Sequence, residues 1–495
     1  MFSRVLVANR GEIAVRIIRS LRDLGIRAVV IYSDVDRGSL HVRLADEAYR
    51  LSGTQGYLDF AQIVDIAKES AVDAVHPGYG FLSENAEFAA ACADAGLVFI
   101  GPHPDHIATM GAKVSAREAM KKAGLKVIPG SGAGTDADLI DCAREIGFPI
   151  MIKAAAGGGG RGMRLVHAPY GLPSALDAAR RESMKAFRSD VVYLERAILR
   201  PRHVEIQVLG DSFGNAVHLF ERDCSIQRRH QKLLEETPAP LTASARALIP
   251  EMALAAQRAT AHLGYAGAGT MEFLLSEDDN SFYFLEMNTR IQVEHPITEL
   301  ITGLDIVQEQ LRVAAGEPLG YTQDDVVHSG HALECRVYAE DPYRGFLPSP
   351  GLLKILREPS GGNVRNDTGY YEGAEVPAAY DALISKLCTW GPTREAAIQR
   401  MQRALFEYVI VGVDTNLSFL SSVLSTQAFQ SGHYATDFID RHPEVLRAPE
   451  PAQDVKRALA IASAYAQQRQ RRSGSSAHSA AQGISAWRRT ALTPS

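Results

Sequence analysis

Cysteine is scarce in this chain, which has only five cysteines among 495 residues and no CxxC pair. Because the cysteines are scattered and odd in number, the sequence indicates neither a disulfide framework nor a zinc site. They are Cys92, Cys142, Cys224, Cys335 and Cys388. We therefore expect a reducing compartment, and the cytoplasm is the predicted location.

Long apolar runs are also missing. No stretch approaches the roughly 20 apolar residues that a membrane-spanning helix needs. The first expected strand, RVLVANR, starts at Arg4. This start leaves no room for a signal or transit peptide, so we expect neither a membrane nor a targeting segment.

Neither sign of charge dominates the composition. The formal net charge of −6 argues against a nucleic-acid partner, although a local basic patch is compatible with it. Hydrophobic residues make up 46% and charged residues 22% of the chain, close to the averages of globular proteins. A chain of this length can bury two or three cores, and this composition agrees with a soluble enzyme.

The most informative segment is EMNTRIQVEHP, in which every second residue from Glu286 to Glu294 has a polar head. In an extended strand alternate side chains share a face. A strand here would line one surface with two carboxylates, two amides and a guanidinium. An ordinary solvated strand face more often carries Thr, Ser and Lys, whereas this set can hold a cation beside an anion. We therefore favour a functional surface.

A second carboxylate is predicted to face Glu286. The segments TMEFLLS and SFYFLEM flank a polar turn and predict a β-hairpin. If Ser276 pairs with Phe282, Glu272 faces Glu286 across the ladder. Like charges directly opposite destabilise a sheet, so either a cation lies between them or the register is off by one residue. With Asn288 they form an oxygen ligand set that suits Mg²⁺ or Mn²⁺ better than Zn²⁺.

A glycine-rich segment, FPIMIKAAAGGGGRGM, predicts a short strand ending at Lys153 and a loop over Gly157 to Gly162. Glycines let backbone N–H groups approach an anion, and the lysine adds a point charge. The spacing is not that of a P-loop, and a glycine run alone is as often a flexible linker. Lys153, Arg161 and the acidic hairpin downstream favour phosphate binding.

The first hundred residues alternate between expected strands and helices. The helix GEIAVRIIRSLRDLG carries an apolar stripe, and four apolar segments around it predict strands of a parallel α/β sheet. These segments are RVLVAN, RAVVIYS, DAVHPG and VFIGP. The single Gly11 does not make a dinucleotide fingerprint, which needs three glycines.

Taken together, these segments resemble the ATP-grasp enzymes and, among them, the biotin carboxylase family. The resemblance covers roughly the first nine-tenths of the chain. Its most specific strings are RDCSIQRRHQK and EMNTRIQVEHP. The others are NRGEIA, HPGYGFLSEN, KAAAGGGGRGM, RHVEIQ, ECRVYAEDP and FLPSPG.

The resemblance implies a mixed α/β and α+β fold of three domains. They are a parallel α/β domain over 1–112, an ATP-grasp domain over 113–327 with a mobile lid at about 130–203, and a mixed domain over 328–441. The remainder, 442–495, is predicted as a helix (Val455 to Gln468) followed by a Ser/Ala/Gln/Arg-rich segment. That segment is expected to be disordered or ordered only by a partner.

The resemblance also implies ligands for ATP and for Mg²⁺ or Mn²⁺. The metal would be held by Glu272, Glu286 and Asn288. Lys113 and Lys153 would hold phosphates, Glu195 to Ile198 would read adenine, and His203 would touch ribose. The ATP-binding set is Lys113, Lys153, Gly158, Gly159, Gly160, Glu195, Ile198, His203, Gln227, His230, Glu272 and Glu286. On spacing alone, Lys113 would be a solvated lysine and His203 and His230 would be structural.

The catalytic set implied by the resemblance is Lys232, Arg290, Glu294 and Arg336. Lys232, Arg290, Gln292 and the backbone of Val293 would place bicarbonate, and Glu294 would remove its proton. Carboxyphosphate would then release CO₂ beside biotin, with Arg336 stabilising the biotin enolate. On spacing alone, Arg336 is equally compatible with a strand surface. Tyr79 and Glu84 are expected to shape a domain interface.

The expected partners follow from what the chain does not contain. EAMKK (118–122) resembles a biotin-carrying hairpin but sits in a helical run, so we expect a surface helix and no biotinyl domain. A biotin carboxyl carrier protein and carboxyltransferase subunits of an acetyl-CoA, propionyl-CoA or pyruvate carboxylase are implied, as is a homodimer. Two alternatives are another ATP-grasp ligase and a non-catalytic protein that binds ATP or supports assembly.

Overall fold

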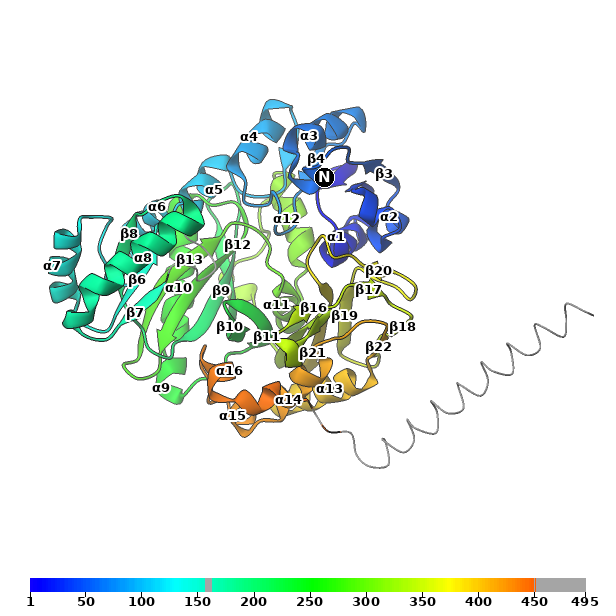
Figure 1. Cartoon of the computed structure of the whole chain (residues 1–495). Coiled ribbons are helices and arrows are strands. Elements are labelled where there is room, and N and C mark those ends of the chain that lie inside the picture. The colour runs from blue at the N-terminus through cyan, green and yellow to red at the C-terminus, as the bar shows by residue number, and fades with distance from the viewer. Residues whose placement is uncertain (156–162, 449, 451–495) are drawn as a thin grey trace, which may run out of the picture. The chain divides into compact units, whose positions relative to one another are not determined.

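The first hundred residues fold into the parallel sheet that their alternating pattern predicts. Its strands lie in the order β3-β2-β1-β4-β5, and each neighbouring pair is parallel. The bounds are β1 (Arg4–Val7), β2 (Arg27–Tyr32), β3 (Glu47–Arg50), β4 (Ala74–His76) and β5 (Val98–Phe99). Helix α1 (Gly11–Asp23) packs its apolar stripe on this sheet, and α3 (Phe60–Glu69) and α4 (Ala86–Asp94) follow (Figure 1).

The computed structural model describes residues 1–155, 163–448 and 450. Met1–Leu446 form one compact unit, to which the following description refers. The glycine loop predicted to bind phosphate, including Gly158, Gly159 and Gly160, lies outside the described residues. The helix predicted over Val455 to Gln468 and the segment after it lie outside them as well.

An eight-stranded sheet dominates the remainder of the unit and carries the residues of interest (Figure 1). Every neighbouring pair in it is antiparallel. Its order is β13 (Ser281–Asn288), β12 (Gly267–Ser276), β9 (Arg202–Gly210), β10 (Ala216–Arg228), β11 (Gln231–Thr237), β14 (His331–Tyr338), β21 (Leu383–Gly391) and β19 (Val364–Thr368). The sheet thus joins strands from both sides of residues 327–328, so that distant segments of the chain share one surface.

A smaller layer lies beside this sheet, at the left of Figure 1. Three strands, β7 (Arg164–Val166), β6 (Ile150–Ala154) and β8 (Val192–Arg196), pack with helices α7 (Asp136–Ile146) and α8 (Leu172–Phe187). They enclose a core of their own that includes Ile150, Ile152 and Leu194. The strand predicted to end at Lys153 is therefore present and ends one residue later.

The hairpin predicted from TMEFLLS and SFYFLEM is confirmed as β12 and β13, and Glu272 does face Glu286. The pairing assumed at the turn is wrong by one residue, because Ser276 pairs with Ser281 and Leu275 with Phe282. A β-bulge restores the register, since Phe273 pairs with Phe284 and one extra residue separates that pair from Glu272 and Glu286.

The structure bears on two expectations, which concern the cysteines and membrane-spanning helices. All five cysteines are free, and four of them are buried. Among the described residues, no helix combines the length and the apolar character that crossing a membrane requires.

Candidate active site

One lysine amine lies among three carboxylates on the eight-stranded sheet. Lys232 of β11 places Nζ 2.6 Å from Glu205, 2.8 Å from Glu272 and 2.7 Å from Glu294. Its side chain is 13% exposed, and burial opposes its charge. The surrounding anionic groups nevertheless hold the pKa of Lys232 well above its usual value. This ammonium therefore remains charged and links three strands and the loop that carries Glu294.

The loop that carries Glu294 differs from the predicted strand. The expectation of extended backbone through Glu294 is wrong, because β13 ends at Asn288 and helix α11 (His295–Thr302) begins directly after Glu294. Pro296 in the first helical turn explains this helix start, since proline is preorganised for that position. The polar side chains still converge, because the Gln292 amide donates to Glu272 over 2.9 Å.

Glu294 itself is a buried, doubly paired carboxylate. It is 1% exposed and accepts from Lys232 at 2.7 Å and from Arg336 Nη2 at 3.0 Å. Burial alone would raise its pKa, but the two cations and nearby Arg222 lower it strongly. Glu294 is therefore ionised throughout the neutral range.

Arg336 lies inside the site and not on a strand surface. It is 8% exposed, and its Nε lies 2.6 Å from Glu235 while Nη2 reaches Glu294. The two carboxylates raise the pKa of Arg336 despite its burial. Its guanidinium thus presents a fixed positive charge beside the Glu294 carboxylate.

The carboxylates of Glu272 and Glu286 are the expected ligands of the divalent metal. Glu272 is already bound by Lys232, by His203 Nε2 at 2.9 Å and by the Asn288 amide at 3.0 Å. The Glu286 side chain reaches solvent. Loss of hydration next to the surrounding protein and the negative charge of Glu272 both raise the pKa of Glu286. An acid pair across a ladder is destabilising unless a cation joins it. The oxygens of Glu272 and Glu286 therefore fit a hard divalent cation.

Other clusters of possible ligands fit a metal less well. Among the described residues, His203, Glu205 and Glu272 form one close group, and Glu205, Cys224 and Glu294 form another. The Lys232 ammonium already binds both carboxylates of each group, whereas it binds only Glu272 of the Glu272 and Glu286 pair, so each group leaves less negative charge for a cation. The Asn288 oxygen accepts from Arg290 Nη2 at 2.9 Å, so that amide oxygen is already engaged.

Two of the residues expected around ATP form an ion pair with each other. Lys153 of β6 pairs with Glu195 of β8, and Arg117 of α6 (Lys113–Lys122) pairs with the same carboxylate. Ile198 lies two residues after the end of β8. Whether these groups bind adenine and phosphates stays a prediction.

The two histidines of the ATP set lie close to each other. His203 is buried, and burial lowers its pKa, but the facing Glu272 carboxylate raises it above the usual value overall. The Gln227 amide lies 3.4 Å from His203 Nδ1. His230 is exposed in the turn after β10. Partial loss of hydration at its ring and the nearby positive charges of His203 and Lys153 lower the pKa of His230. The Lys113 charge favours ionised Glu286, which places Lys113 near the proposed metal ligands.

Of the residues expected to place bicarbonate, Lys232 contacts Glu294 directly, and Val293 precedes Glu294 in the chain. Arg290 binds Glu84 through Nε at 2.9 Å and Asn288 through Nη2. Glu84 also accepts from the Thr289 N–H at 3.1 Å, so the N-terminal part contacts this loop as expected. The Val293 carbonyl accepts a hydrogen bond from Lys386 Nζ at 3.0 Å.

Several site residues were not identified from the sequence. Arg222 is fully buried and binds Glu205, Thr298 and the side-chain oxygen of Gln292. Arg117 binds Glu195. Glu205 and Arg222 lie in the strings RHVEIQ and ERDCSIQRRHQK, and Glu205 shares its strand face with His203 and Gln207. That alternation was the signal that could have placed Glu205 in the site.

The chain is similar to known proteins along most of its length. Three family models match the chain, namely "Biotin carboxylase, N-terminal domain" over residues 1–107, "Carbamoyl-phosphate synthase L chain, ATP binding domain" over residues 112–322 and "Biotin carboxylase C-terminal domain" over residues 334–441. The chloroplastic biotin carboxylase of Arabidopsis thaliana is 50% identical over 459 residues, which cover 92% of this chain and 85% of that protein.

Two further relatives come from other carboxylases. A pyruvate carboxylase subunit of Methanothermobacter thermautotrophicus is 48% identical over 448 residues, which cover 89% of this chain and 90% of that protein. The structure of the biotin carboxylase domain dimer of Hydrogenobacter thermophilus 2-oxoglutarate carboxylase, in complex with MgADP, ADP and bicarbonate, gives a TM-score of 0.85 at 45% identity. It covers 91% of this chain and 100% of that chain.

Proposed function

The chain belongs to the biotin carboxylase family of ATP-dependent ligases, and we propose that it forms carboxyphosphate from ATP and bicarbonate and carboxylates biotin that is carried on a separate protein. One observation carries this proposal. A buried, ionised carboxylate, Glu294, lies within hydrogen-bond distance of both Lys232 and Arg336. A base between two fixed cations suits a step in which an anion loses a proton.

ATP and a divalent cation meet on the hairpin side of the site in this proposal. Glu272 and Glu286 hold Mg²⁺ or Mn²⁺, which neutralises phosphate charge when it is bound. Lys113 and Lys153 add two positive charges for the phosphates. Phosphoryl transfer depends mainly on such positioning and charge neutralisation, and it does not require a covalent nucleophile.

Bicarbonate occupies the side of the site that Lys232, Arg290 and Glu294 line. Lys232, Arg290, the Gln292 amide and the Val293 N–H orient it, and Glu294 accepts its proton. A bicarbonate oxygen then bonds to the terminal phosphorus of ATP while the bond to ADP breaks. Carboxyphosphate yields CO₂ and phosphate, and the released phosphate takes the proton from biotin N1. The N1 atom then bonds to the CO₂, while Arg336 stabilises the negatively charged ureido oxygen of biotin.

The test is ATP hydrolysis by the purified chain with and without bicarbonate and free biotin. We expect hydrolysis that requires bicarbonate and rises when biotin is added. Hydrolysis with another carboxylate in place of bicarbonate would favour a different ATP-grasp ligase. Binding of ATP without any turnover would instead favour a non-catalytic role.

The carrier is proposed to be a separate protein because the one lysine string that resembles a biotin site is helical. EAMKK lies within α6, whereas a biotin-carrying lysine of the resembled type sits in a hairpin. We expect an avidin blot to be negative for this chain and positive for a smaller protein that co-purifies with it. A biotin signal on this chain would contradict the proposal.

The final acceptor of the carboxyl group is proposed to be an acyl-CoA such as acetyl-CoA or propionyl-CoA. Pyruvate is the second candidate, because a pyruvate carboxylase component matches the chain as closely as the named biotin carboxylases do. Isolation of the intact complex from its source and assay with acyl-CoA or pyruvate separates the two. We further propose a homodimer, testable by sedimentation, and a cytoplasmic location that suits five free thiols.

A further inference from the structure

A second buried lysine holds the loop that carries Glu294. Lys386 of β21 has a fully buried side chain, and its Nζ donates to the Val293 carbonyl at 3.0 Å. The same ammonium lies 3.1 Å from Glu12 and 3.9 Å from Asp367. Burial lowers the pKa of Lys386, but these carboxylates raise it overall, so the donor is charged. A charged donor to a backbone carbonyl makes a stronger hydrogen bond than a neutral one.

The position of Lys386 in the sheet relates it to Arg336. The two residues are direct partners across β14 and β21, so their side chains lie on the same face. Two cations directly opposite one another destabilise a sheet unless both are compensated. Here the pair contacts two adjacent parts of one loop, since Lys386 binds the Val293 carbonyl and Arg336 binds the Glu294 carboxylate.

The preceding peptide group of the loop, between Gln292 and Val293, is also held by a hydrogen bond. His295 is buried, and burial together with nearby cations lowers its pKa well below the usual value, so its ring is neutral. Its Nδ1 lies 2.7 Å from the Gln292 carbonyl, which requires Nδ1 to donate. The carbonyls of Gln292 and Val293 are thus both fixed. Because the Val293 N–H and the Glu294 side chain belong to the same short loop, fixing these carbonyls restricts the directions in which both can point.

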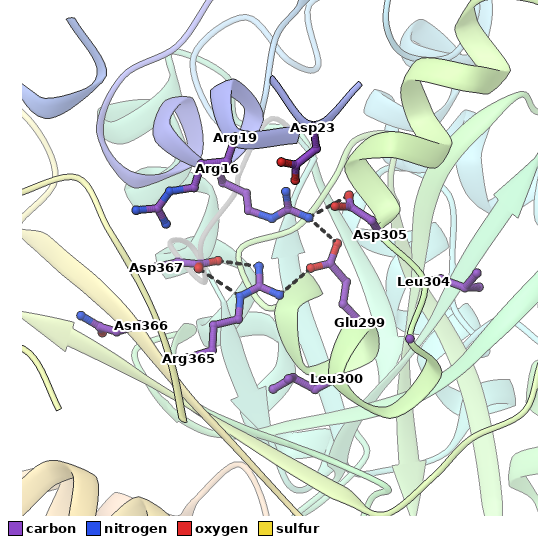
Figure 2. A pocket seen from close by; sticks show the side chains of 11 residues that line it. Arg16, Arg19, Asp23, Glu299, Leu300, Leu304, Asp305, Arg365, Asn366 and Asp367 are labelled. Carbon is purple, nitrogen blue, oxygen red and sulfur yellow. Dashed lines mark hydrogen bonds and ion pairs between the residues drawn. The ribbon is translucent and has the colours of Figure 1, made fainter. Parts of the chain in front are cut away.

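The far side of Lys386 is supported by a chain of ion pairs. Asp367 faces Lys386 across β19 and β21, and Arg365 binds Asp367 through two nitrogens at 3.0 and 2.7 Å. Arg365 continues to Glu299 at 2.7 Å, and Glu299 pairs with Arg16 at 2.9 Å. Figure 2 shows these pairs on the wall of a polar cavity of about 450 Å³. The ammonium of Lys386 therefore has fixed anions behind it and the Val293 carbonyl in front.

We propose that Lys386 is a positioning residue for bicarbonate activation, because it holds the Val293 carbonyl and thereby directs the Val293 N–H and the Glu294 carboxylate toward bicarbonate. This inference rests on the proposed function. Lys386 acts through the loop and touches no substrate. The ATP side of the site, with Lys153 and Glu195, makes no contact with it.

The test compares bicarbonate and ATP kinetics of the variant Lys386→Met, which keeps an unbranched side chain of nearly the same length but removes the donor. A displacement of about 1 Å at a reacting group can lower a rate roughly 100-fold. We expect kcat/KM for bicarbonate to fall about that much, with KM for ATP within about threefold of wild type. Lys386→Arg, which retains a charged donor, should recover part of the loss. A KM for ATP that rises by as much as the bicarbonate kcat/KM falls, or a bicarbonate kcat/KM near wild type, would overturn the proposal.

Two further variants separate positioning from loss of stability. Lys386→Met leaves Glu12 without its cation, so the double variant Lys386→Met/Glu12→Gln removes both charges and should regain stability. Positioning requires that its bicarbonate kcat/KM stays low, and recovery of activity together with stability would overturn the proposal. Arg394→Met removes a remote cation that binds Glu236 at 2.6 Å and two backbone carbonyls. It should lower stability without changing the ratio of bicarbonate to ATP kinetics.

The wild-type enzyme distinguishes this inference from the function on which it rests. If wild type shows no bicarbonate-dependent ATP hydrolysis, the proposed function fails and the role of Lys386 fails with it. If wild type is active and Lys386→Met keeps its bicarbonate kinetics, only the role of Lys386 is overturned.

Discussion

Replacing Glu294 with glutamine is expected to lower bicarbonate-dependent ATP hydrolysis by roughly 1,000-fold, within the range ascribed to a general base. Glutamine keeps the shape of the side chain and one acceptor for Lys232 or Arg336, but it cannot take up a proton. The proton is removed only on the way to carboxyphosphate, so nucleotide affinity should stay within about threefold of wild type. Steady-state kinetics and calorimetric titration with a nonhydrolysable ATP analogue measure the two quantities.

A matched variant shows whether the loss is specific. Glu221→Gln alters another buried carboxylate of the same sheet, which accepts from the Ala239 N–H and binds none of the site cations. It should retain bicarbonate-dependent turnover. If ATP affinity collapses in Glu294→Gln, Glu294 has a structural role and the assignment of the base is wrong.

The stability of Glu294→Gln should depend on pH in a defined direction. The folded pKa of Glu294 lies below its unfolded value, so its ion pairs stabilise the protein above the unfolded pKa of about 4.3. That contribution is lost as pH falls through the folded value. The variant should therefore be less stable than wild type near pH 7. Thermal unfolding should show the difference narrowing as the pH falls below about 4.

The hairpin of β12 and β13 shows which structural features a local sequence pattern can predict. Alternation and a polar turn predicted both strands and the opposition of Glu272 and Glu286, and the structure confirms them. The pairing assumed at Ser276 was wrong, and a bulge next to Phe273 compensated for the error. A bulge depends on how the strand packs against its neighbours, which the sequence of the hairpin alone does not reveal.

The arrangement around Glu294 depended on contacts that no local pattern contains. Alternation predicted a strand through Glu294, whereas the start of α11 turns that segment into a loop. Lys386 and Arg336 both contact this loop, and they are adjacent only because β21 lies beside β14 in the sheet. Strand order in an eight-stranded antiparallel sheet is a long-range property. The family resemblance supplied roles for Lys232 and Arg336, while the supporting residues became visible only in the fold.

The second large effect is expected for the metal ligands, at Glu286→Gln. Glutamine has nearly the same shape but removes one of the two charges that face each other on β12 and β13. Ligand charge sets much of the affinity for a divalent cation, so the Mg²⁺ concentration for half-maximal ATP hydrolysis should rise at least about tenfold. The maximal rate should also fall, because phosphate charge is then less well neutralised.

The measurement is a Mg²⁺ titration of ATP hydrolysis, together with Mn²⁺ binding followed by electron paramagnetic resonance in the presence of ADP. Asp278→Asn is the control, since Asp278 is an exposed carboxylate in the turn of the same hairpin. It removes the same charge from the protein but lies outside the proposed ligand set. If Glu286→Gln and Asp278→Asn share the metal dependence of wild type, the Glu272 and Glu286 pair does not bind the metal. Because Glu286→Gln also removes the repulsion with Glu272, that outcome should come with a gain in stability and no change in catalysis.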